Sequence, residues 1–226
     1  MEYASYEFIN EERARVKVTL GASSTPVWFQ NRWQSDPDEL AQYIVRNGCG
    51  HCCAAMALTM RKIPLDPLGE YRLCRSLWGA PEEVVGEDGK KSGQGNFQSA
   101  FGIARILRHH GLRAEVYGVG DASAVREHIL SALSSGKLVI FCVRPTEPSA
   151  LNPFSLGYHW VMAVGYCASG GILVANSAEK YAPTGVQEVD IDSIIPALCH
   201  GAAPRDMTWG EWSEDFLEGT GYLTVD

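Results

Sequence analysis

The chain has 226 residues, of which 46% are apolar and 20% charged, so it can bury a full hydrophobic core within one domain. Its net charge of −8 argues against a nucleic-acid or anionic-membrane partner, because such binding needs a positive surface. No apolar run approaches the roughly 20 residues of a membrane span, and the first residues lack a basic region followed by an apolar one. These features predict a cytoplasmic protein without membrane insertion, or one secreted by another route.

The first half of the chain is predicted to be helical after one strand. Residues 13–20 alternate polar and apolar, which is typical of a half-buried edge strand, and residues 21–26 form a turn. Asp36 and Asp66 each precede a proline, a combination that starts helices. The expected helices span residues 36–46, 49–63, 67–78 and 97–110.

The second half is predicted to be richer in strands. A helix capped by Asp121 or Ser123 runs through residue 135. Expected strands span residues 112–117, 137–143, 158–166, 171–175 and 187–191. This order predicts an α+β fold of one domain, in which a helical lobe packs against an antiparallel sheet. The lobe is expected over residues 1–110, the sheet over 111–200, and an acidic C-terminal extension over 201–226.

The cysteines are expected to be reduced. Their number, seven, is odd, and Cys74, Cys142 and Cys167 lie in apolar segments where thiols pack as small hydrophobic groups. Cys49 differs, because it stands between Gly48 and Gly50 at the expected start of a buried helix. Unpaired amides at such a start favour a thiolate, the form that attacks carbonyl groups. Cys49 is therefore the candidate nucleophile.

A nucleophilic thiol needs a base, and His159 is the best placed of the six histidines. It lies in a rigid strand, whereas the other histidines lie at a helix end, in an amphipathic helix, in a loop, or too close to Cys49 in sequence. Asn176 ends the next strand, where its carbonyl could hold the second nitrogen of the imidazole ring. We therefore expect Cys49, His159 and Asn176 to meet.

The sequence resembles a known family in these same places. The matching residues are Gln30, Gly48-Cys49-Gly50, Ala54 to Leu58, Gly157-x-His159-x-Val161-x-x-Val164-x-Gly165 and Ile172 to Asn176. In this order they are similar to papain-fold cysteine peptidases related to the double-glycine peptidases that process bacteriocins. The resemblance spans residues 26–195 and implies a papain-like fold, a peptide or protein substrate, and no metal or organic cofactor.

The resemblance also implies a role for each site residue. Cys49 is the nucleophile, His159 the general base and later acid, and Asn176 the residue that orients the ring. Gln30, or alternatively Gln34, donates to the oxyanion. The chain departs from the family where His51-Cys52-Cys53 replace the usual small residues after Cys-Gly, and where Asn176-Ser177 replace the usual Asp-Pro.

Several other functions remain open. The tetrapeptide Cys49-Gly50-His51-Cys52 also occurs in protein disulfide isomerases, so the rival hypothesis is a thiol-disulfide oxidoreductase that uses Cys49 and Cys52. The same triad also serves amidases, deamidases and acyltransferases, and a pseudoenzyme would hold a peptide without cleaving it. A zinc site within residues 49–53 is disfavoured because the donors are too crowded. The oligomeric state is not determined by these patterns.

Overall fold

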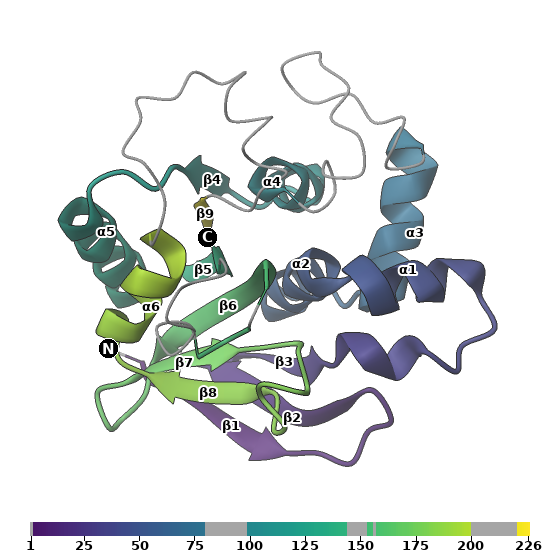
Figure 1. Cartoon of the computed structure of the whole chain (residues 1–226), viewed down its shortest axis with the longest axis horizontal. Helices are drawn as coiled ribbons and strands as arrows, with labels where there is room; N and C mark the ends of the chain where they lie inside the picture. Colours follow the sequence, from purple (N-terminus) through teal and green to yellow (C-terminus); the bar gives the residue numbers. More distant parts are fainter. Residues whose placement is uncertain (1, 80–98, 144–152, 156, 200–220) are drawn as a thin grey trace.

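The chain folds around two antiparallel sheets that pack on a shared helix (Figure 1). The computed structural model describes residues 2–79, 99–143, 153–155, 157–199 and 221–226. The three-stranded sheet has the order β1-β2-β3, with β1 (Ala4–Phe8), β2 (Ala14–Leu20) and β3 (Ser23–Trp28). The six-stranded sheet has the order β4-β9-β5-β6-β7-β8. Its strands are β4 (Ala114–Tyr117), β9 (Tyr222–Val225), β5 (Leu138–Val143), β6 (His159–Tyr166), β7 (Ile172–Ala175) and β8 (Val186–Val189).

The helices flank these sheets and fill the space between them. They are the 3-10 helix η1 (Gln30–Trp33), α1 (Glu39–Asn47), α2 (Cys49–Met60), α3 (Pro67–Trp78), α4 (Ala100–His109), α5 (Ala122–Ser134) and α6 (Ile191–Cys199). The expected α+β class, with helices and antiparallel strands, is confirmed by this arrangement.

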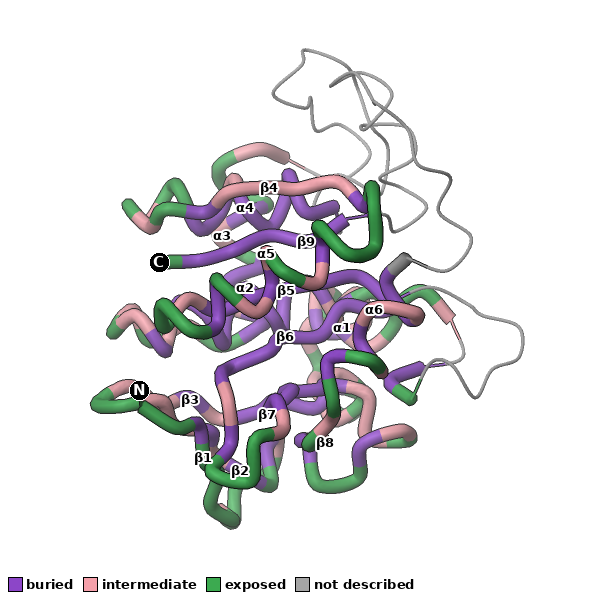
Figure 2. Tube along the Cα trace, turned by 90° about the vertical axis from the view of Figure 1, so that its left-hand side faces the viewer, coloured by how far each residue is buried: buried purple, intermediate pink, exposed green. Residues whose placement is uncertain are grey.

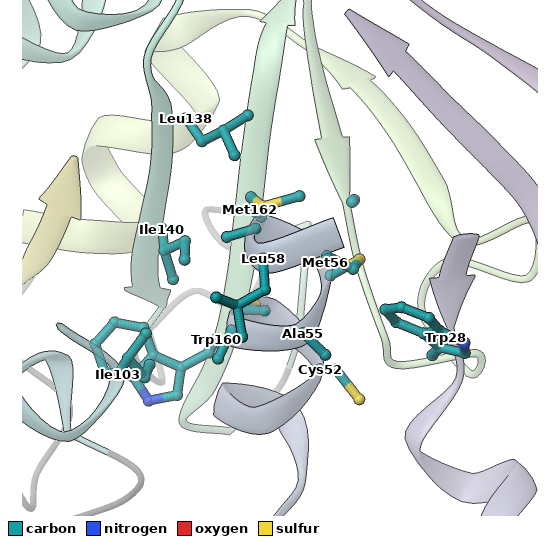
Figure 3. Close-up of a cluster of buried hydrophobic side chains, with 14 of the residues drawn as sticks. Trp28, Cys52, Ala55, Met56, Leu58, Ile103, Leu138, Ile140, Trp160 and Met162 are labelled. Atoms are coloured by element: carbon teal, nitrogen blue, oxygen red, sulfur yellow. The ribbon is translucent and has the colours of Figure 1, made fainter. Parts of the chain in front are cut away.

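Helix α2 lies at the centre of the molecule. It contacts β3 on one side and β6 on another, and α3 and α4 pack against it as well. Figure 3 shows its Met56 near Trp28 of β3, and its Leu58 near Trp160 of β6. Because nearly every residue of α2 is buried, the helix carries no polar face and is held by packing on all sides. Figure 2 shows this buried trace of α2 together with β5 and β6.

The six-stranded sheet is covered on both faces. Alternate residues of β5 belong to two separate cores, with Ile140 facing the core around α2 and Phe141 facing the core under α5 and α6. A strand buried on both faces reads as a continuous apolar run, which explains the pattern of residues 137–143. The same alternation continues in β6, so both faces of the strand that begins at His159 are packed against a core.

The N-terminal region contains more strands than the sequence indicated. The expected edge strand, β2, is the middle strand of its sheet, because β1 and β3 pair with it on either side. The residues expected to form a turn, 21–26, instead lie largely in β3. Pro26 is tolerated there because β3 is an edge strand and the proline needs no ladder partner for a missing N–H.

The helix starts follow the capping signals, with one shift. Asp66 accepts a hydrogen bond from the Gly69 amide, and Asp121 accepts one from the Ala124 amide, as expected for N-cap residues. Helix α1 begins at Glu39 rather than at Asp36, because Asp38 is the N-cap. The Asp36 carboxylate is used instead to accept from the Asp38 amide and from Arg13.

The last residues of the chain do not form the expected C-terminal extension. Strand β9 is buried between β4 and β5 and pairs with both, so it is an interior strand of the large sheet. Helix α6 was also unexpected, since it contains Pro196, a residue that usually ends helices. The rest of the expected extension, residues 201–220, lies outside the described residues. Within the described part of the chain, no helix is both long and apolar enough to cross a membrane.

Candidate active site

Cys49 is the first residue of α2, and Gly48 makes the joint with α1 that places it there. The Gly48 amide donates to the Ile44 carbonyl of α1, while the Gly48 carbonyl accepts from the Cys52 amide of α2, both at 2.8 Å. A Cβ at position 48 would lie 2.3 Å from the Ile44 oxygen. Only glycine therefore allows α2 to start immediately where α1 ends, and this fixes the position of the Cys49 thiol.

The thiol of Cys49 lies against the start of β6. Its sulfur accepts a hydrogen bond from the backbone amide of Trp160, the residue that follows His159. The Gly50 amide also favours the thiolate, as expected at a helix start, but burial is the largest influence and raises the pKa of Cys49 above its ordinary value. The amides at the helix start lower this pKa as expected, but desolvation of the half-buried Cys49 outweighs them, so the net shift is upward. The resting thiol is protonated at neutral pH.

His159 and Asn176 form the expected pair. The Nε2 atom of His159 lies 2.8 Å from the Oδ1 atom of Asn176, and both side chains are buried. The orientation of the Asn176 amide is fixed by backbone groups, because its Oδ1 accepts from the Ala178 amide while its Nδ2 donates to the Phe154 carbonyl. An oxygen at that position can only accept, so Nε2 of the neutral ring carries the hydrogen and Nδ1 carries the lone pair.

Burial also sets the charge of His159. It lowers the pKa of the ring to about 4, and the hydrogen bond to Asn176 opposes the shift without cancelling it. The ring is therefore neutral at physiological pH, with Nδ1 able to take a proton. At neutral pH the site therefore holds a protonated Cys49 thiol and a neutral His159 ring.

Gln30 is placed between the two halves of the site. Its backbone amide donates to the Ser177 carbonyl at 3.1 Å, and its side-chain Nε2 donates to the Val45 carbonyl at 3.0 Å. The first bond ties it to the residue after Asn176, and the second ties it to the end of α1 just before Cys49. One Nε2 hydrogen remains for a ligand. The alternative, Gln34, is exposed at the end of η1.

The segment 176–179 connects the parts of the site. Asn176 binds His159, and Ser177 binds the Gln30 backbone. Glu179 then holds η1, the helix that begins with Gln30, because its carboxylate accepts two bonds from Arg32 at 2.6 and 3.2 Å. Asn31 and Arg15 contact the same carboxylate. Sequence reasoning missed Glu179, since its partners lie about 150 residues earlier in the chain.

The two cysteines after Cys49 point into the core. Cys52 and Cys53 are fully buried and unpaired by disulfides, like the other cysteines in the described part of the chain. Burial, together with the neighbouring Cys49, holds the pKa of Cys52 well above its usual range, while Ser177 opposes the shift. Cys52 therefore packs α2 against the residues that follow β7. A thiol in this position favours a structural role over exchange with a substrate disulfide.

A second polar cluster lies behind the site. His51 of α2 meets Glu70 and Cys74 of α3, and their donor atoms lie within 4.8 Å of one another. His51 and Glu70 are bonded through Nδ1 and a carboxylate oxygen, and the Cys74 thiol donates to the other carboxylate oxygen at 3.2 Å. These three donors could hold a metal ion, although a structural zinc site takes four. Sequence reasoning considered His51 only with its neighbouring cysteines and did not connect it to α3.

Comparisons with known proteins find a likeness in structure but no match in sequence. No family model matches the chain, and no curated protein sequence matches it. Among solved structures, the chain is similar to a candidate C39-like peptidase from Bacillus anthracis, with 12% identity and a TM-score of 0.41. The alignment covers 80% of this chain and 88% of that one. At these values the likeness does not bear on the chemistry of the site, which rests on its own contacts.

Proposed function

We propose that the chain is a cysteine peptidase, or a related amide hydrolase, with a papain-like fold in a single domain. The observation that carries the proposal is that the start of α2, the start of β6 and the residue after β7 meet. The Cys49 thiol accepts from the Trp160 amide, and the adjacent His159 ring is held by Asn176 through Nε2. This leaves Nδ1 as the base for a thiol at the start of a buried helix. The substrate class is a peptide or protein, and the reaction needs no cofactor.

The proposed reaction begins with proton transfer from the Cys49 sulfur to Nδ1 of His159 as the sulfur attacks the carbonyl carbon. The oxyanion formed accepts hydrogen bonds from the Cys49 amide and the free Nε2 hydrogen of Gln30. Collapse breaks the C–N bond, and His159 gives its proton to the leaving amine. Water, deprotonated by His159, then attacks the thioester and restores the thiol.

Covalent labelling tests the proposal directly. A peptide that ends in an electrophilic carbonyl or nitrile is expected to add one equivalent to Cys49, as mapped by mass spectrometry of the intact protein and its fragments. Cys49→Ala is expected to abolish the adduct, whereas Cys167→Ala, which removes a free thiol outside the site, keeps it. Labelling at Cys52, or a reversible disulfide between Cys49 and Cys52, would instead support the oxidoreductase.

The products distinguish the remaining alternatives. A peptidase releases a new amino terminus, a deamidase releases ammonia from a side-chain amide, and an acyltransferase passes the acyl group to an added amine. A pseudoenzyme binds the peptide without turnover and forms no adduct. From their positions in the sequence, residues 79–96 and 144–156 are candidates to border the cleft, and they lie almost entirely outside the described residues. A peptide substrate library measures the sequence preference.

We expect the rate to fall at acidic pH through protonation of His159. The ring must be neutral to take the thiol proton, and its pKa is lowered to about 4, so kcat/KM is expected to be constant near neutral pH and to fall as the pH drops through about 4. The measurement is a pH profile with a small amide substrate, with far-UV circular dichroism at each pH to show that the fold persists. An acid limb at pH 6 to 7 would contradict the proposed role of the buried ring.

Glu179→Gln is expected to affect turnover more than stability. The bond between Glu179 and Arg32 is partly exposed, so its loss should cost about 1 kcal/mol or less in unfolding free energy. Loosening η1 displaces Gln30, and we expect kcat to fall up to about tenfold, since complete loss of an oxyanion donor costs about 10²- to 10³-fold. Glu115→Gln on β4, which removes a similar pairing with Arg113, is the matched control and should leave kcat unchanged.

A further inference from the structure

The side chain that holds Asn176 from behind is Gln187 of β8. Gln187 pairs with Val174 across the β7–β8 ladder, which places its side chain beside the end of β7. Its Oε1 accepts from the Nδ2 atom of Asn176 at 2.8 Å, and its Nε2 donates to the Pro153 carbonyl at 2.9 Å. A backbone carbonyl can only accept, so the orientation of the Gln187 amide is determined by Pro153.

These contacts form a continuous chain of hydrogen bonds that ends at the His159 ring. The order is Pro153 carbonyl, Gln187 amide, Asn176 amide, His159 imidazole. Each amide donates at one end and accepts at the other, so each bond polarises the next and strengthens the last acceptor. Both Nδ2 hydrogens of Asn176 are used, one by Phe154 and one by Gln187, and Asn176 has no exposed surface. Without Gln187, one of these hydrogens would be buried with no acceptor.

We propose that Gln187 is a positioning residue for the reaction proposed above, holding and polarising Asn176 so that its carbonyl keeps His159 in the tautomer that takes the Cys49 proton. This inference rests on the proposed function for its effect on turnover. It predicts a second measurable effect, on the His159 ring itself, that does not require turnover. Gln187 does not touch the substrate or the reacting atoms in this role.

Two substitutions separate the acceptor from the shape of the side chain. Gln187→Leu keeps the volume but removes the acceptor, and kcat is expected to fall about tenfold with KM unchanged, the size of one lost orienting hydrogen bond. Gln187→Glu keeps an acceptor for Asn176 and is expected to recover most of kcat. Its negative charge favours the protonated ring, so the acid limb of the pH profile is expected to move to higher pH.

Gln42→Leu is the matched control. Gln42 also donates to a backbone carbonyl, that of Gln34, but on the exposed surface of α1 and away from Asn176. Thermal unfolding of Gln42→Leu and Gln187→Leu shows how much of any change comes from stability alone. The proposal requires a kcat loss in Gln187→Leu that Gln42→Leu does not share.

Nitrogen NMR of the imidazole rings, without substrate, supplies the independent readout. The wild type is expected to show His159 neutral at pH 7 with the hydrogen on Nε2, and Gln187→Leu is expected to show a mixture of tautomers. A wild-type ring signal and wild-type kcat in Gln187→Leu would overturn the inference, as would equal losses in the Gln42 control. If Cys49 fails to label but the ring responds to Gln187, the proposed function fails while the effect of Gln187 on the His159 tautomer stands.

Discussion

Replacing His159 with alanine is expected to lower kcat by a factor of about 10³ or more, while peptide binding persists. General-base catalysis contributes about 10² to 10⁴ in rate, and here the burial that raises the pKa of Cys49 makes the base indispensable at neutral pH. The reaction of Cys49 with an electrophilic peptide should slow by a similar factor. The measurements are kcat, the rate of adduct formation, and the Kd of a non-cleavable peptide.

His159→Gln provides a variant of similar volume that can still donate to Asn176. Its neutral amide has no basic nitrogen to take the thiol proton. It should lose activity as severely as alanine, which separates the loss of the base from the loss of packing. The control histidine is His128 of α5, whose ring contacts the Tyr222 hydroxyl at 2.7 Å on the other side of the sheet. If His128→Ala and His159→Ala reduce kcat equally, the role proposed for His159 is wrong.

Glu70→Ala is expected to lower the free energy of unfolding by about 3 to 5 kcal/mol. Glu70 is 1% exposed and accepts from both His51 and Cys74, so its loss leaves two buried donors without their acceptor and opens a cavity. Because His51 lies two residues after Cys49, the start of α2 should loosen as well. Urea unfolding followed by circular dichroism gives the first quantity, and the rate of Cys49 labelling gives the second.

Two further variants make the Glu70 prediction specific. Arg72→Ala, on the exposed side of the same helix, removes only a surface pairing with Asp38 and should leave the free energy of unfolding nearly unchanged. Combining His51→Leu with Glu70→Leu replaces the buried pair by apolar groups, and the double variant should be more stable than Glu70→Leu alone. Additive losses in the double variant would show that the two side chains do not stabilise each other.

The elements with strong local signals could be predicted from the sequence. Asp66 and Asp121 cap the helices they were expected to cap, because an N-cap bond joins residues two or three positions apart. The strand of residues 137–143 was recognised because burial on both faces makes every residue apolar. Strands β1 and β3 were missed because β1 is mostly exposed and β3 contains a proline. Such strands depend on a neighbour, here β2, that supplies their hydrogen bonds.

The candidate residues of the site were also visible in the sequence, where their order and spacing pointed to chemistry. Gly48 before Cys49 at a helix start, and Asn176 at the end of the strand after His159, are local patterns that survive in the fold. The supporting residues were not visible. Glu179 reaches Arg32, and Gln187 reaches Pro153, only after the chain has folded, and no local pattern marks such polar residues in advance.

By itself the sequence determined the mixed helical and antiparallel class, most helix starts, and the pairing of His159 with Asn176 in the candidate site. Only the tertiary structure decided the protonation of that site. The helix start alone favours a Cys49 thiolate, but β6 and the surrounding core desolvate the half-buried Cys49 and the buried His159 ring, which raises the pKa of the first and lowers that of the second. Desolvation depends on every neighbour that folding brings near, so no local pattern in the sequence reveals it. The placement of β9 inside the sheet also depends on distant residues, since its partners β4 and β5 lie far away in the sequence.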